Sequence, residues 1–176
     1  MRTLTGTLRL AVVLALAAVT GIATAQHAAW PARPIQLIVA YPPGGVSNAI
    51  ARALAERVSQ QIGVPVVVEN RAGAGGVNAM KLLASAKPDG HVLVFSAVSP
   101  LTLAPQLGPI GFDPEKDIAP VMSVMMTPVL VVGTQALAGG TFADLISIAK
   151  ASPGSVRWAT SGTATVGHMV LEQVRA

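Results

Sequence analysis

Short apolar runs alternate with longer polar-apolar segments between residues 34 and 132. The runs 35–40, 64–69 and 91–96 are rich in valine, isoleucine and leucine, as buried strands are. The segments between them have the spacing of helices. Strands that alternate with helices predict an α/β fold with a mainly parallel sheet, whose ligand sites lie at the carboxyl ends of the strands.

Two helices are predicted between these strands. Residues 47–62 carry apolar side chains at four-residue steps, as expected of a helix packed on a sheet, and Gly63 follows as a C-cap. A second helix covers about 76–86. It ends at residues 87–90, where Pro88 blocks continuation and the Asp-Gly pair favours a turn.

The chain after residue 101 predicts a crossover to a second lobe. A Pro- and Gly-rich connection leads to the apolar run 121–132. Thr141 and Asp144 form a capping box for a helix that ends near residue 151, and a short strand at 156–159 precedes a helix that reaches the last residue. We expect three parts: a signal peptide (1–25), a first α/β lobe that lacks its return segment (26–125) and an incomplete second lobe (126–176).

The first residues predict export. Arg2 and Arg9 form a basic head, residues 10–22 are apolar, and Ala23-Thr24-Ala25 is a small-residue cleavage site, with cleavage after Ala28 as the alternative. A membrane anchor is the alternative, but the apolar run is short for a bilayer span. We expect a periplasmic protein with no stable membrane insertion once the signal is removed.

Composition narrows the class of protein. The chain is 52% hydrophobic and 11% charged, which is typical of a folded domain rather than a disordered one. Removal of Arg2 and Arg9 would reduce the net charge from +4 to +2, and the remaining basic residues are dispersed, so no nucleic-acid partner is expected. There is no cysteine, hence no disulfide and no thiolate metal site.

Three glycine- or hydroxyl-rich loops are candidates for ligand binding. The first, at 41–48, joins a strand end to a helix start, where unpaired backbone N–H groups and the helix dipole favour an anion. An ordinary Pro-Gly turn is the alternative, and neither a Walker nor a dinucleotide motif is present. The second, at 69–76, exposes further backbone donors, and its Arg71 is predicted either to meet a carboxylate or to pair with Glu69. The third, at 160–165, offers hydroxyl groups before a helix that bears His168.

The sequence predicts neither catalysis nor a cofactor. Ser161 and His168 lack an orienting acid and a nucleophile elbow. The three histidines are far apart, and the acidic residues at 113–117 lack the glycine and terminal glutamate of a calcium loop. An α/β enzyme is the rival class, and it would need a convergent acid, base or nucleophile.

Taken together, the motifs resemble the tripartite tricarboxylate transporter receptor family, the Bug-type periplasmic binding proteins. The resemblance covers essentially all of the chain after the signal. It rests on ordered motifs: Trp30-Pro31 with Arg33-Pro34-Ile35, Tyr41-Pro42-Pro43-Gly44-Gly45, Val68-Glu69-Asn70-Arg71 with Gly73-Ala74-Gly75-Gly76, Pro88-Asp89-Gly90, Phe112-Asp113-Pro114 with Lys116-Asp117, Pro153-Gly154, and Ser161-Gly162 through Thr165 to His168.

The resemblance implies a two-lobed, type II periplasmic-binding-protein fold with the first and third loops facing each other across a cleft. It further implies a monomer that captures a small carboxylate, such as a di- or tricarboxylate, an amino acid or an aromatic acid, for the permease subunits of a tripartite transporter. A sensor that presents the carboxylate to a two-component kinase is the alternative. The expected ligand-binding residues are Pro43, Gly44, Gly45, Ser47, Asn48, Gly75, Gly76, Thr160, Ser161, Thr163, Thr165 and His168.

The chain departs from the family pattern in three ways. Asn48 stands where an aspartate is usual, and Ala164 stands where a second glycine is common. The family is also about twice as long as this chain, as two ordinary lobes require. We therefore expect an N-terminal fragment that binds ligand weakly or not at all.

Overall fold

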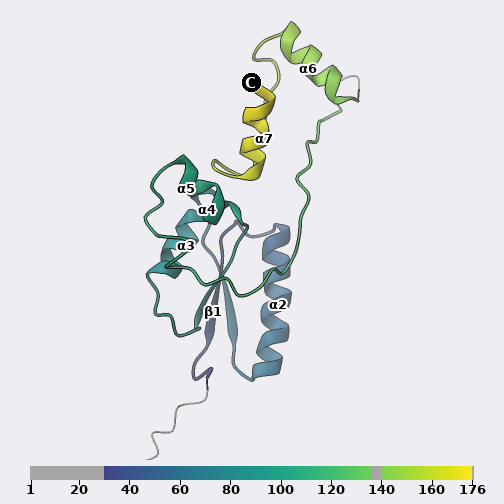
Figure 1. Cartoon of the computed structure of the whole chain (residues 1–176). Coiled ribbons are helices and arrows are strands. Elements are labelled where there is room, and N and C mark those ends of the chain that lie inside the picture. The colour runs from purple at the N-terminus through teal and green to yellow at the C-terminus, as the bar shows by residue number, and fades with distance from the viewer. Residues whose placement is uncertain (1–29, 136–139, 176) are drawn as a thin grey trace, which may run out of the picture. The chain divides into compact units, whose positions relative to one another are not determined.

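The computed structural model describes residues 30–135 and 140–175 (Figure 1). The chain divides into two units, Met1–Ala32 and Arg33–Ala176, and the helices and strands below belong to the second. The predicted signal peptide and its cleavage site lie outside the described residues. Within the described part, no helix is long and apolar enough to cross a membrane.

Three parallel strands form the sheet, as the alternating pattern predicted. β1 (Ile35–Val39) lies between β2 (Val66–Asn70) and β3 (Val92–Phe95). Val39 aligns with Asn70 on one side and with Phe95 on the other, so the three carboxyl ends lie level. β2 begins later than predicted because Pro65 has no N–H to donate; its carbonyl oxygen accepts from the Ile35 N–H at 2.9 Å.

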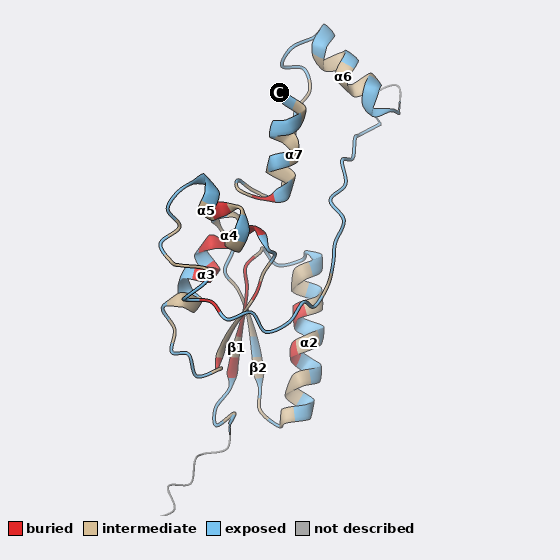
Figure 2. Cartoon of the chain, viewed as in Figure 1, coloured by how far each residue is buried: buried red, intermediate tan, exposed pale blue. Residues whose placement is uncertain are grey.

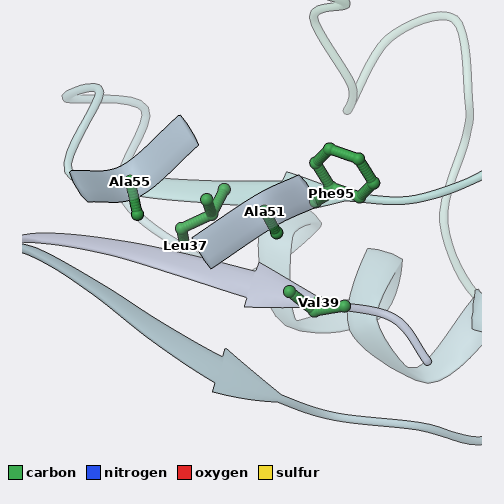
Figure 3. Packing of buried hydrophobic residues seen from close by; sticks show 5 residues of the cluster. All are labelled: Leu37, Val39, Ala51, Ala55 and Phe95. Atoms are coloured by element: carbon green, nitrogen blue, oxygen red, sulfur yellow. The ribbon is translucent and has the colours of Figure 1, made fainter. Parts of the chain in front are cut away.

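The core forms on both faces of β1. On one face, Ala51 and Ala55 of α2 (Val46–Ile62) pack against Leu37, Val39 and Phe95 (Figure 3). On the other face, Ile38 and Ala40 pack against Ala79 of α3 (Val77–Ala84). The alanines let both helices approach the sheet closely. Cover on both faces explains why β1 is apolar almost throughout.

The predicted helix ends are mostly confirmed. Gly63 is left-handed with φ 69°, and its N–H donates to the Ser59 carbonyl at 3.0 Å. The helix predicted over 76–86 consists of a 3-10 turn, Ala74–Gly76, followed by α3.

Two short helices, α4 (Ser99–Thr102) and α5 (Ala104–Leu107), were not predicted. Each carries a proline in its first turn, where the missing N–H costs no helical bond.

The second half of the chain buries less surface. α6 (Phe142–Ala151) and α7 (Val166–Arg175) contain no buried residue (Figure 2), and most of the large apolar side chains between 121 and 132 are exposed. The predicted strand at 156–159 is wrong: these residues form no strand in the described chain. A strand needs the hydrogen bonds of a neighbour, and no described segment pairs with these residues.

Candidate functional site

Tyr41 ties the carboxyl ends of the three strands together. It follows β1, and its carbonyl oxygen accepts a hydrogen bond from Asn70 Nδ2 at 2.9 Å. Its hydroxyl oxygen accepts from the Ala97 N–H, just after β3, at 3.1 Å. The first two candidate loops therefore begin at strand ends that these hydrogen bonds hold in fixed relative positions. Sequence reasoning missed this role, for which the only signal was a lone tyrosine beside two prolines and an asparagine at the end of a strand.

The first loop leaves the start of α2 open. Gly45 precedes the helix without any side-chain cap, and no acidic residue lies in the first turn. Pro43, Gly44 and Gly45 are exposed, whereas Ser47 and Asn48 are half-buried. Asn48 Oδ1 accepts from Arg52 Nε at 3.3 Å, one turn along the helix. The backbone N–H groups at this helix start thus have no side-chain acceptor from the loop.

The second loop contains one glycine that the packing requires. Gly76 is buried with φ 103°, and a Cβ added to it would lie 2.8 Å from Pro100 Cγ and 3.2 Å from Ser96 Oγ. Any side chain would therefore collide with the segment after β3. Packing accounts for this residue without a ligand.

Arg71 pairs with Glu69, which confirms one of the two predicted alternatives. Glu69 also accepts from Gln36 Nε2 at 2.5 Å. This ion pair already supplies a carboxylate to the guanidinium group. We therefore do not place Arg71 among the ligand-binding residues.

The third loop is held by its own hydroxyl groups. Thr165 is buried, and its Oγ1 donates to the Gly162 carbonyl at 2.7 Å and accepts from the His168 N–H at 3.4 Å. Thr160 Oγ1 accepts from the Gly162 N–H at 3.2 Å. Ser161 and Thr163 are exposed. Of the hydroxyl groups predicted to bind ligand in this loop, those of Ser161 and Thr163 are therefore the most accessible to solvent.

His168 lies in the first turn of α7. Its Nε2 is 3.7 Å from Glu172 Oε1, and its Nδ1 is buried without a hydrogen-bond partner in the described chain. Ser161 is not among the groups bonded to this ring.

The structure brings the second and third loops together. A Cβ added to Gly75 would lie 2.7 Å from the Thr163 carbonyl oxygen and 3.4 Å from Thr165 Cγ2. Residues almost ninety positions apart in the sequence are therefore in van der Waals contact. Sequence reasoning placed Gly75 in the site as a backbone donor and did not predict this contact.

The helices behind the three loops have uncompensated positive ends. No acidic residue lies in the first turn of α2, α3 or α7, and neither α2 nor α3 has a side-chain cap. α6, which follows none of these loops, is different: Thr141 Oγ1 accepts from the Asp144 N–H, and Asp144 accepts from the Thr141 N–H. The starts of α2 and α3 thus lack both an acidic residue and a side-chain cap, as the four-residue helices α4 and α5 also do, whereas α7 lacks the acidic residue but has Thr165 as a cap. A helix start of this kind attracts an anion.

Clefts also lie among the described residues, and two of them are lined mainly by residues outside the three candidate loops. One, of about 360 Å³, lies between α2 and β2, away from the candidate loops. The other, of about 460 Å³, is lined by Thr160, Ser161 and Arg157 and otherwise mainly by apolar side chains, including those of 129–132, Leu145 and Val170. Apolar walls suit packing more than they suit a charged group.

The acidic segment at 113–117 is a self-contained turn. Asp113 accepts from the Glu115 N–H at 3.0 Å and from Lys116 Nζ at 2.6 Å, and the Lys116 ammonium lowers the pKa of the Asp113 carboxyl. Nowhere in 30–135 or 140–175 do three potential metal ligands gather. The turn geometry accounts for these acids without a metal ion.

A parallel α/β sheet whose strands lead through glycine-rich loops into helix starts places ligands at the carboxyl ends of its strands. A solved periplasmic transporter structure shares this fold, with a TM-score of 0.67 at 31% identity, covering 84% of this chain and 50% of that one. Residues 50–176 match the model of the tripartite tricarboxylate transporter family receptor. The chain therefore belongs to this receptor family.

Individual relatives support both the family and the fold. Protein BugT of Bordetella pertussis is 39% identical over 166 residues, which cover 93% of this chain and 51% of BugT. Among solved structures, Rhodopseudomonas palustris Rpa4515 with adipate superposes with a TM-score of 0.74 at 29% identity, covering 81% of this chain and 48% of that one. MatC from the same organism, with bound malate, gives a TM-score of 0.64 at 29% identity, covering 69% and 42%. The chain spans about half the length of the relatives it matches.

Proposed function

We propose that the protein is a receptor that captures a small carboxylate at the loops before α2, α3 and α7. The observation that carries the proposal is the contrast between these helix starts, which have no acidic residue in their first turns, and α6, whose start is closed by its capping box. A carboxylate would supply the negative charge that these ends lack, and at α2 and α3 it would also supply the missing hydrogen-bond acceptors.

The charges nearby favour recognition by backbone groups. Arg71 is paired with Glu69, and Arg52 donates to Asn48. Accordingly, we assign the ligand contacts to N–H groups of residues 44–48 and 75–76 and to the exposed hydroxyls of Ser161 and Thr163. Thr160, Thr165 and His168 support the third loop from behind.

The relatives support the ligand class. Adipate and malate, named in the two structures above, are both dicarboxylates of different length. A site built on backbone donors tolerates such variation because it reads the carboxylate rather than the rest of the molecule. We assign this chain a ligand of the same chemical class.

The family also supports a place and a partner for the receptor. We infer that the protein acts in the periplasm as a monomer and delivers its ligand to the membrane subunits of a tripartite transporter. A sensor would bind the same ligand, so the two roles are separated by solute uptake: loss of uptake in a strain without the protein supports delivery, and unchanged uptake contradicts it.

A thermal-shift series tests the binding proposal. A ligand that binds only the folded chain stabilises it, by about 2.7 kcal/mol when the ligand concentration is one hundred times the Kd. This stabilisation raises the melting temperature. Because weak binding is expected of a chain that spans half of its relatives, the series extends to high ligand concentrations. There we expect adipate or malate to raise the melting temperature, and the uncharged adipamide and dimethyl adipate to leave it unchanged. Equal shifts with the uncharged compounds, or no shift with any carboxylate despite cooperative melting, would contradict the proposal.

A further inference from the structure

Gly75 is the point where the second and third loops meet through their backbones. The atom nearest to an added Cβ is the carbonyl oxygen of Thr163, at 2.7 Å, which is closer than real Cβ contacts come. From the other side, a Cβ added to Gly162 would lie 4.0 Å from Gly75 N. The absence of a side chain at residue 75 therefore allows the two loops to come this close.

The third loop cannot easily change its shape to relieve this contact. Its shape is fixed by the Thr165 hydroxyl, which bonds to the Gly162 carbonyl at 2.7 Å and caps α7 through the His168 N–H. Thr165 itself is only 5% exposed. Because the colliding atom would be a backbone oxygen and not the end of a flexible side chain, rotation of a side chain would not relieve the overlap.

Both loops hold an alanine in a left-handed conformation beside the contact. Ala74 has φ 48° and Ala164 has φ 58°, a region that residues other than glycine rarely occupy. Such conformations persist only where the surroundings hold them. The loop shapes on the two sides are thus tied to their mutual contact.

We propose that Gly75 is a positioning residue that sets how closely the hydroxyl loop 160–165 approaches the glycine loop 73–76, and through this distance the fit of the carboxylate. The inference rests on the proposed function, since both loops belong to the candidate site. A methyl group at residue 75 would displace the third loop and move Ser161 and Thr163 away from the backbone donors of the second loop.

Gly63 provides a matched control for Gly75→Ala. Gly63 has nearly the same dihedral angle, φ 69° against 61°, but a Cβ added there meets nothing within 4 Å. Gly63→Ala therefore introduces the same backbone strain without a collision. Any effect that Gly75→Ala has and Gly63→Ala lacks belongs to the contact with the third loop.

The experiment uses two readouts on the whole chain. Hydrogen exchange of the amides between 160 and 168 reports the loop contact without ligand, and titration with adipate and malate reports binding. We expect faster exchange in this loop, and about tenfold weaker binding, in Gly75→Ala only; tenfold is the loss expected when a hydrogen bond to a charged group is no longer made.

The exchange data test the contact between the two loops, and the titrations test the role of that contact in ligand binding. Unchanged exchange in Gly75→Ala would overturn the contact, and changed exchange with unchanged affinity would overturn its role in binding. If the unsubstituted chain binds no carboxylate, the proposed function fails and the binding role fails with it, while the exchange data still decide the contact. Gly75→Ala/Thr165→Ser, which removes the methyl at 3.4 Å but not the carbonyl at 2.7 Å, should not restore binding.

Discussion

Asp89 fastens the turn that leads from α3 into β3. One of its oxygens accepts from the His91 N–H at 3.0 Å, and the other pairs with Arg33 Nη2 at 2.9 Å, ahead of β1. The His91 N–H and then the Arg33 guanidinium lower the pKa of Asp89 from 3.8 to about 2. One residue therefore links the entrance of β3 to the entrance of β1.

This lowered pKa predicts an acid dependence of stability. A carboxyl group whose pKa is lower in the folded state stabilises that state above its unfolded pKa, and the contribution is lost as pH falls from about 4 to about 2. We expect Asp89→Asn to lower the melting temperature at pH 7 and to converge with the unsubstituted chain near pH 2. Arg33→Gln, which leaves the His91 bond in place, should show a smaller difference. Parallel melting curves from pH 7 to 2 would contradict the assignment.

Because β1 lies between α2 and α3, we expect its stability to be the most sensitive to the shortening of buried side chains. Val39 is fully buried, whereas Val67 on the neighbouring β2 is 54% exposed. We expect Val39→Ala to lower the free energy of unfolding by about 2–3 kcal/mol, since it leaves a cavity, and Val67→Ala by no more than about 0.5 kcal/mol. Urea unfolding of both variants gives the comparison, and equal losses would show that the core does not centre on β1.

Elements whose signals are local could be predicted from the sequence. The four-residue apolar step gave α2, Gly63 gave its end, and Thr141 with Asp144 gave the start of α6, because each depends on residues within a turn of one another. The strand at 156–159 could not be judged in this way, since its pairing depends on a distant segment. The left-handed alanines 74 and 164 were equally hidden, because alanine carries no preference for that conformation.

The candidate site shows the same division. The loops were located from glycines and hydroxyls beside predicted helix starts, which is local information. The Tyr41 ties and the approach of Gly75 to Thr163 join residues that are far apart in sequence, so they required coordinates.

At the scale of the whole molecule, the apolar surface is unevenly covered. Both faces of β1 are covered by helices, while Val121, Met126, Leu130 and Val132 are 80%, 94%, 72% and 82% exposed. A soluble protein rarely presents so many large apolar side chains in one run. The boundary between lobes that we place near residue 125 stays a prediction.

Export is the prediction that concerns the whole chain. Expressed in a Gram-negative host, the protein should be released by osmotic shock with Gln26 as its first residue, since signal peptidase accepts the small residues Ala23 and Ala25. Ala23→Asp should block processing, whereas Ala28→Asp should not. Mass spectrometry of the released protein decides this; a mature chain that begins at Ala29, or no release at all, would contradict it.

The open starts of α2 and α3 also bear on the lifetime of the protein. A side-chain cap contributes about 1 kcal/mol to a helix, and neither of these helices has one. A bound anion would restore that missing stability, and a more stable fold spends less time open to proteases. The amount of receptor in the cell would then follow the supply of its ligand, without any change in gene expression.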